Sequence, residues 1–267
     1  MSTRILLLDA GNTRLKWAVL DTALNSLALH KPDSHELLLS APCPWLDQGV
    51  APYDDLTELF WLWQKWGVLA ACYGVNVAGE ARAVSLSNLL AKFELKPVWL
   101  HATRYACGVK NLYRPPESLG ADRWAALLAV RQRTREASLI VSAGSALTVD
   151  AMDADGQFLG GVIVPGLRMM RQALASSTAQ VGIQHGEVLA FPNTTADAVE
   201  TGLIAACAGA IEIVKGRLEK LSGDLPRLFL TGGDAAMLEP FLPLGVVIIP
   251  GLVLEGVYYL SVEEGIT

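Results

Sequence analysis

Residues 5–16 read Ile5-Leu6-Leu7-Leu8-Asp9-Ala10-Gly11-Asn12-Thr13-Arg14-Leu15-Lys16. An apolar run of strand length ends in a carboxylate, a Gly-Asn-Thr turn follows, and a basic residue lies on a second apolar stretch. Such a hairpin offers backbone N–H groups, a hydroxyl and an ammonium group to an anion. Asp9 is unsuited to an anion, but a carboxylate can hold the metal ion that accompanies a phosphate. We therefore expect an ATP-binding loop here.

The composition is that of a chain with a large buried interior. The 267 residues allow two domains, and 52% are apolar while 18% are charged, below the roughly 25% that is usual. The net charge of −6 does not favour nucleic acid or an anionic membrane as a partner. No apolar stretch reaches about 18 residues without Gly, Pro or a charge, and no signal segment precedes the first strand. We expect a cytoplasmic protein.

The four cysteines, Cys43, Cys72, Cys107 and Cys207, are widely spaced and form no C-x-x-C pair. In a reducing compartment such residues remain thiols. We therefore expect neither a disulfide framework nor a cysteine-built metal site.

The opening segment has a counterpart near the middle of the chain. Leu-Leu-Leu-Asp-Ala-Gly-Asn at 6–12 aligns with Leu-Ile-Val-Ser-Ala-Gly-Ser at 139–145, about half the chain length away. Each copy has an apolar strand, a glycine turn and a second strand. In the second copy Asp155-Gly156 favours a further hairpin, followed by a strand over 158–164. The pattern indicates an internal duplication.

The remaining periodicity supports two α/β lobes. Helices are expected over 56–66, 79–93, 124–133, 167–176, 195–221 and from 252, and strands over 68–77, 97–100, 227–231 and 246–249. The Pro-rich segment at 113–116 favours a crossover between the halves. We therefore expect one lobe over 1–120 and another over 121–267, with the small-molecule site in a cleft between them.

Gly120-Ala121-Asp122-Arg123 lies at the start of an expected helix. An aspartate in a first turn has an ordinary explanation, because it interacts favourably with the helix dipole. The functional alternative is that Asp122 accepts a hydroxyl proton while Arg123 pairs with a substrate carboxylate. The sequence alone leaves both interpretations open.

Three further glycine segments are also ambiguous. Gly144-Ser145 is either an ordinary hairpin turn or a second phosphate loop. Gly160 to Gly166 fits close backbone packing and ligand approach equally well. Gly232-Gly233 follows an apolar strand and is either a common turn or a place where a nucleotide packs directly against the main chain.

In this order the motifs resemble those of the type III pantothenate kinase family, within the actin, Hsp70 and sugar-kinase superfamily. Asp9 to Lys16 is similar to the family's D-x-G-N-[ST]-x-x-K loop, and Gly120 to Arg123 matches its G-A-D-R motif. Gly160 to Leu174 resembles its G-G-x-I-x-P-G…M…A-L segment, and Thr195 to Gly202 resembles its T-x-x-A-x-x-x-G segment. The resemblance covers essentially the whole chain.

The resemblance implies duplicated RNase H-like lobes, a homodimer, and ATP-dependent phosphorylation of pantothenate in coenzyme A biosynthesis. It implies Asp122 as the catalytic base, and Asp9 as the carboxylate for Mg²⁺ carried by ATP. The implied ATP contacts are Asp9, Ala10, Gly11, Asn12, Thr13, Arg14, Leu15, Lys16 and Ser145. The implied pantothenate contacts are Tyr113, Gly120, Ala121, Asp122, Arg123 and Thr195.

One position departs from the family pattern. Many members carry an aspartate that is thought to bind K⁺ or NH₄⁺ where this chain has Ser142. A neutral hydroxyl cannot supply the same charge, so we expect weakened or lost K⁺ activation, or a site completed by other ligands.

Two alternatives to pantothenate phosphorylation stay open: another small-molecule kinase activity of this superfamily, and a non-catalytic or additional role as a regulatory accessory factor.

Overall fold

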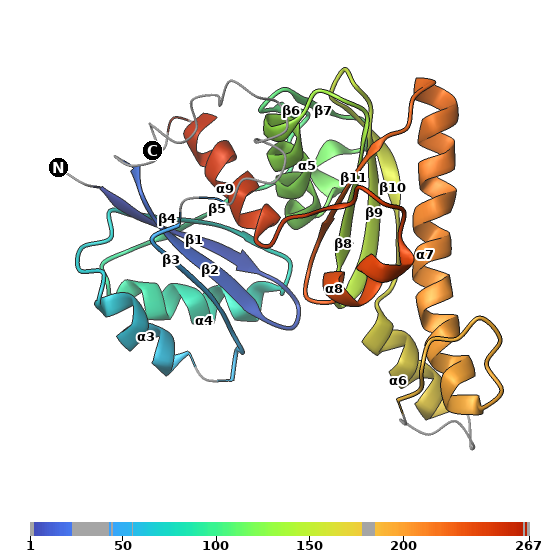
Figure 1. The fold of residues 1–267 in the computed structure, drawn as a ribbon. Coiled ribbons are helices and arrows are strands. Elements are labelled where there is room, and N and C mark those ends of the chain that lie inside the picture. The colour runs from blue at the N-terminus through green and yellow to red at the C-terminus, as the bar shows by residue number, and fades with distance from the viewer. Residues whose placement is uncertain are drawn as a thin grey trace. The chain divides into compact units, whose positions relative to one another are not determined.

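A computed structural model describes residues 3–22, 43, 45–54, 56–177, 185–263 and 265. The chain forms two compact units. The first contains residues 1–135 together with 251–267, and the second contains residues 136–250. Each combines helices and strands in an α/β arrangement (Figure 1).

The sheet of the first unit has the order β3-β2-β1-β4-β5. Its strands are β1 (Arg4–Ala10), β2 (Leu15–Asp21), β3 (Asp47–Ala51), β4 (Ala71–Asn76) and β5 (Pro97–Trp99). The first three are antiparallel neighbours, whereas β4 and β5 run parallel to β1. A short antiparallel hairpin of β6 (Tyr105–Ala106) and β7 (Val109–Asn111) also belongs to this unit.

Helices cover both faces of this sheet. Alternate residues of β1, including Leu6 and Leu8, pack with α3 (Thr57–Gln64) and α4 (Glu80–Ala91). Successive side chains of a strand point to opposite faces, so Asp9 faces away from this core. The strands also contact α5 (Ala121–Arg133) and α9 (Leu252–Glu263). Figure 1 shows α3 and α4 below the sheet of the first unit and α9 above it.

Helices α5 and α9 pack very closely against each other. A Cβ atom at Gly256 of α9 would collide with the backbone of Ala125 in α5, so the contact requires glycine. A buried ion pair between Arg133 Nη2 and Glu255 Oε2, 2.7 Å long, also joins the two helices. The last helix is thereby fixed to the helix that carries the G-A-D-R motif.

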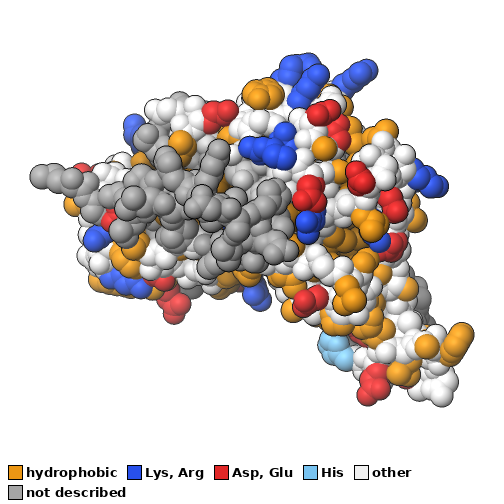
Figure 2. All heavy atoms as spheres, turned by 45° about the horizontal axis from the view of Figure 1, so that its top comes forward, with side chains coloured by type: hydrophobic (Ala, Val, Ile, Leu, Met, Phe, Trp, Pro, Cys, Tyr) orange, Lys and Arg blue, Asp and Glu red, His pale blue; other side chains and the backbone are white. Residues whose placement is uncertain are grey.

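The second unit repeats this plan. Its strands are β8 (Ser138–Ala143), β9 (Ala146–Met152), β10 (Gln157–Pro165), β11 (Arg227–Thr231) and β12 (Val247–Ile248), in the order β12-β11-β8-β9-β10. Here too the first three are antiparallel neighbours, and β11 and β12 run parallel to the first. The helices are α6 (Leu167–Ser177), α7 (Thr195–Ser222) and α8 (Ala235–Leu238). Figure 2 shows hydrophobic side chains at the surface of the end of this unit that carries α6.

The predicted duplication is confirmed by this topology. Strands β1 to β5 correspond in order and direction to β8 to β12, which gives two RNase H-like sheets. The aligned residues Ala10 and Ala143 each end the first strand of a unit. The expected helices and strands are all present, with ends that shift by at most three residues.

The grouping of residues differs from the predicted lobes of 1–120 and 121–267. Helix α5 and the C-terminal α9 both belong to the first unit, because they pack on each other and contact its sheet. The Pro-rich segment at 113–116 was a misleading boundary signal, since it precedes α5, which still belongs to the first unit.

The four cysteines are free thiols, as expected. Among the residues that the structure describes, none of the helices combines the length and apolar character that a membrane crossing requires.

Candidate active site

The central pair of the site is Asp9 and Lys16. Strands β1 and β2 are in register so that Asp9 lies directly opposite Lys16, and opposite residues of an antiparallel pair share one face. Lys16 Nζ lies 2.9 Å from Asp9 Oδ2, and Asp9 is only 3% exposed. The pairing follows from the sequence spacing, because Ala10 pairs with Leu15 and leaves a four-residue loop between the strands.

That loop, residues 11–14, lies where β1 ends and beside the end of β4. The amide of Val77, just after β4, donates to the Ala10 carbonyl at 3.0 Å. Asn12, Thr13 and Arg14 are exposed. The structure therefore places an accessible turn at the carboxyl ends of two parallel strands, the position where open α/β sheets bind ligands.

Asp122 lies in the first turn of α5, and the charge of Asp9 acts on it. Burial raises the pKa of the Asp122 carboxyl, the backbone amide of Arg123 lowers it, and nearby Asp9 raises it. Arg123 N donates to Asp122 Oδ1 at 2.8 Å. A Cβ at Gly120 would lie 2.8 Å from the same oxygen, so glycine leaves room for this carboxylate. A raised pKa suits a group that accepts a proton.

Arg123 and Tyr113, which the family resemblance names separately as pantothenate contacts, lie against each other in the structure. Arg123 Nη1 donates to the Tyr113 hydroxyl oxygen at 2.9 Å, and its guanidinium lies 5.4 Å from the centre of that ring. The fully buried Asn111 fixes the backbone at Tyr113, since its side-chain oxygen accepts a hydrogen bond from the Tyr113 amide. The pair offers a cation and a hydroxyl beside Asp122.

The donor set suits a magnesium ion that arrives with a nucleotide. Within the described ranges, no group of three or more His, Cys, Asp or Glu side chains is arranged to hold a metal ion. Mg²⁺ is commonly bound through one or two carboxylates together with substrate phosphates. Asp9, buried and close enough to influence Asp122, meets that requirement.

Ser145 lies in a corresponding turn of the second unit. The carbonyl of Ala143 accepts from the Asp234 amide at 3.0 Å, as the carbonyl of Ala10 does from Val77. The Gly166 amide donates to the Ser145 carbonyl at 3.0 Å. Cβ atoms at Gly166 and Gly232 would collide with backbone atoms of 143–145. Both glycine segments therefore serve close backbone packing around this turn.

Ser142 and Thr148 are the second unit's counterparts of Asp9 and Lys16. They lie opposite each other on β8 and β9, and Thr231 of β11 lies beside Ser142 on the other side. The charged pair of the first loop is thus replaced by hydroxyl side chains. Thr195 is exposed and is the first residue of α7, whose cap is the neighbouring Thr194.

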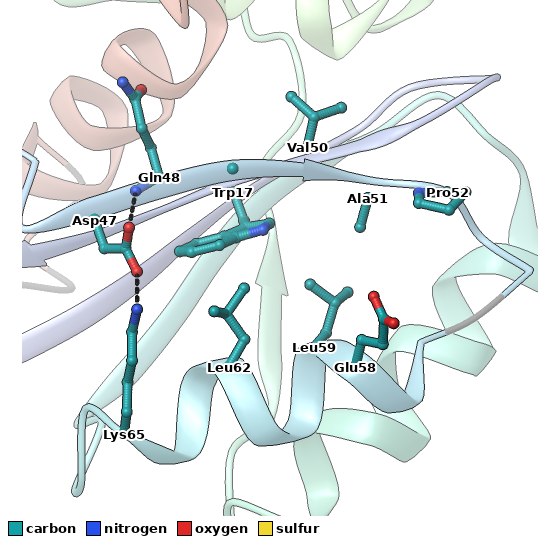
Figure 3. Close-up of a pocket in the computed structure, with 11 residues that line it drawn as sticks. Trp17, Asp47, Gln48, Val50, Ala51, Pro52, Glu58, Leu59, Leu62 and Lys65 are labelled. Atoms are coloured by element: carbon teal, nitrogen blue, oxygen red, sulfur yellow. Dashed lines mark hydrogen bonds and ion pairs between the residues drawn. The ribbon is translucent and has the colours of Figure 1, made fainter.

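A separate pocket of about 250 Å³ lies between β3 and α3 (Figure 3). Trp17 and Leu59 contribute apolar walls, and the ion pair of Lys65 and Asp47 closes one end. Gly49 leaves space for the Trp17 indole, which a Cβ there would meet at 2.7 Å. None of the predicted site residues lines this pocket.

The duplicated RNase H-like sheets define the fold class of the actin-like and sugar-kinase proteins. A putative Baf family transcriptional activator from Campylobacter jejuni has a similar structure, with a TM-score of 0.56 at 19% identity over 98% of this chain and 100% of that chain. A putative 2-dehydro-3-deoxygalactonokinase from Sinorhizobium meliloti gives 0.55 at 11% identity, over 96% and 98%. At these identities the likeness concerns the fold alone.

Sequence comparison is more specific. The family description "Type III pantothenate kinase" matches residues 5–216. Proteins of that name from Nitrosospira multiformis and Thiobacillus denitrificans are 37% and 38% identical to it, over 100% and 96% of this chain and 94% and 96% of theirs. The chain belongs to the type III pantothenate kinase family.

Proposed function

We propose that this protein transfers the γ-phosphoryl group of ATP to the hydroxyl of pantothenate, the first step of coenzyme A biosynthesis. Family membership over the whole chain supports the reaction. One observation supports assigning the reaction to particular residues: the Asp9–Lys16 ion pair and the G-A-D-R turn belong to the same unit, and Asp9 is close enough to raise the pKa of Asp122.

The proposed ATP site is the loop Asp9 to Lys16. Lys16 and the loop amides would bind the phosphates, and Asp9 would hold the Mg²⁺ that neutralises charge on the β- and γ-phosphates. Lys16 is paired with Asp9 in this structure, so the two groups are already oriented toward one point. Ser145, in the turn of the second unit, is proposed as a further ATP contact on the family resemblance.

The proposed pantothenate site is built on the start of α5. The Arg123 guanidinium would pair with the pantothenate carboxylate, and Tyr113 supports that guanidinium. Asp122 would orient the attacking hydroxyl and take its proton late, because a carboxylate is too weak a base to ionise an alcohol beforehand. Gly120 leaves space for Asp122. Ala121 and, by resemblance, Thr195 complete the proposed contacts.

We also propose a cytoplasmic homodimer, with no nucleic-acid or membrane partner. Large apolar side chains are exposed on the second unit, including Ile163, Phe191 and Ile213, and Figure 2 shows hydrophobic side chains gathered near α6. Exposed apolar groups favour subunit contacts. Sedimentation should give about twice the monomer mass of 28.6 kDa.

The direct test is an ADP-release assay with pantothenate on the parent protein and Asp122→Asn. We expect pantothenate-dependent turnover in the parent and a loss of about 100-fold or more in the variant, the usual scale for removing a general base. Equal turnover in both would refute the role of Asp122. Absence of pantothenate-dependent ADP release in the parent would refute the proposed function and favour a regulatory role.

A further inference from the structure

Tyr53, which no motif includes, contacts the proposed ATP loop. It follows β3 and is 7% exposed, and its hydroxyl donates to the Gly11 carbonyl at 2.8 Å. Gly11 is the first residue of the loop. A buried phenol 42 positions away in the chain is thus bound to the backbone that would cradle a phosphate.

The orientation of that carbonyl fixes the orientation of the next amide. A peptide group is planar and trans, so the carbonyl of Gly11 and the N–H of Asn12 point in opposite directions. Tyr53 belongs to the core under α3 and α4, with Leu8 and Leu15. The Gly11 carbonyl therefore turns toward that core, and the Asn12 N–H turns toward the opposite face, where Asp9 and Lys16 pair.

The Asn12 amide is available for a ligand. Asn12 is exposed, and its N–H donates to no other residue in the part of the chain that the structure describes. Backbone N–H groups at a turn are the donors that phosphate-binding loops present. A free rotation of this peptide would instead present the Gly11 carbonyl oxygen, which repels a phosphate.

Arg82 of α4 lies over the Tyr53 ring. The Arg82 guanidinium lies 4.5 Å from the ring centre, within the range of a cation–π contact. Burial, together with the nearby charge of Asp9 and against the opposing charge of Arg82, raises the pKa of Tyr53 to about 12. The phenol therefore remains a hydrogen-bond donor throughout the neutral range.

We propose that Tyr53, held by Arg82, is a positioning residue for ATP: its hydroxyl fixes the Gly11–Asn12 peptide so that the Asn12 N–H faces the nucleotide phosphates. The proposal rests on the ATP site proposed above. It assigns to Tyr53 an effect on ATP affinity and none on pantothenate or on the chemical step.

The test is Tyr53→Phe, which keeps the ring and its contact with Arg82 but removes the hydroxyl. We expect the KM for ATP to rise about tenfold, the scale of one hydrogen bond, with kcat, the KM for pantothenate and the Tm nearly unchanged. Tyr105→Phe is the matched control, because Tyr105 is exposed at the surface. Arg82→Met should give a smaller rise, and Arg82→Lys should restore most of the parent value.

A second readout follows the Asn12 amide itself. In ¹⁵N-labelled parent protein the Asn12 amide resonance should shift when a non-hydrolysable ATP analogue binds, and this shift should be lost in Tyr53→Phe.

Lys16→Met is the reference variant, because it removes a proposed phosphate ligand of the same loop. An unchanged KM for ATP in Tyr53→Phe, with a raised one in Lys16→Met, would overturn the positioning role alone. Unchanged values in both would overturn the ATP site as well. Equal rises in both substrates' KM with a lower Tm would show a merely structural role.

Discussion

The two loops of this protein lie at corresponding places in their units but differ in length and in charge. In each unit an Ala-Gly turn connects two antiparallel strands, and the alanine carbonyl accepts a hydrogen bond from an amide just after a parallel strand. The first loop carries the ion pair of Asp9 and Lys16, whereas the second carries Ser142 opposite Thr148. The duplicated fold has thus kept the place of both loops in the sheet, while the paired charges are present in the first loop and absent from the corresponding positions of the second. On this difference we propose that the metal and phosphate chemistry belongs to the first unit.

The helices that cover the two sheets differ as well, and the largest expected effect tests this difference. Gly256 in α9 touches the backbone of Ala125, whereas a Cβ at Gly216 in α7 would meet nothing within 4 Å. Gly256→Ala should cost about 3 kcal/mol of unfolding free energy, because packed backbone must move. Gly216→Ala should instead add about 0.5–1 kcal/mol through helix propensity. Urea denaturation measures both, and changes of the same sign would contradict the account.

The charge of the first unit should also reduce its stability. Burial and nearby Asp9 raise the pKa of Asp122, so the folded state binds this proton more tightly than the unfolded state does. Stability from this group is therefore present at acid pH and is lost as the pH rises through the raised pKa. Asp122→Asn should raise the Tm at pH 7, and its advantage over the parent should shrink as the solution is acidified.

The exposed Asp224 provides the control, since Asp224→Asn should leave the Tm nearly unchanged. A lower Tm for Asp122→Asn at pH 7 would show that the ionised carboxylate stabilises the fold. In activity measurements, kcat/KM of the parent should fall on its acid side as Asp122 becomes protonated.

The smallest expected effect concerns Ser142. We expect the parent to turn over at similar rates in K⁺ and in a bulky organic cation, because a hydroxyl supplies no charge. Ser142→Asp places a carboxylate beside Thr148 and Thr231 and should make K⁺ stimulate the rate a few-fold. Ser142→Asn is the neutral control of similar size. A collapse of the parent rate without K⁺ would refute this expectation.

Much of the fold could be predicted because its signals are local. The strand, turn and strand around Gly11 place Asp9 opposite Lys16 by spacing alone. The similar segment at 139–145 predicts the second sheet. The G-A-D-R turn places Asp122 and Arg123 at a helix start without any long-range information.

What could not be predicted depends on contacts between distant segments. The bond of Tyr53 to Gly11 and the stacking of Arg82 on Tyr53 bring together three segments that share no motif. The packing of α9 in the first unit depends on the close approach of Gly256 and Ala125. The pattern of apolar residues along the sequence does not indicate this contact. The roles of Ser145 and Thr195 remain predictions from the family resemblance.

The central claim is that charge in the first loop, and not its counterpart in the second, carries Mg·ATP. The most direct measurement compares kcat/KM for ATP in Asp9→Asn and Ser142→Ala, at saturating pantothenate and fixed Mg²⁺. We predict a loss of about 1,000-fold in Asp9→Asn and less than about fivefold in Ser142→Ala, because phosphoryl transfer depends on metal-assisted charge neutralisation. Losses of similar size, or a larger loss in Ser142→Ala, would contradict it.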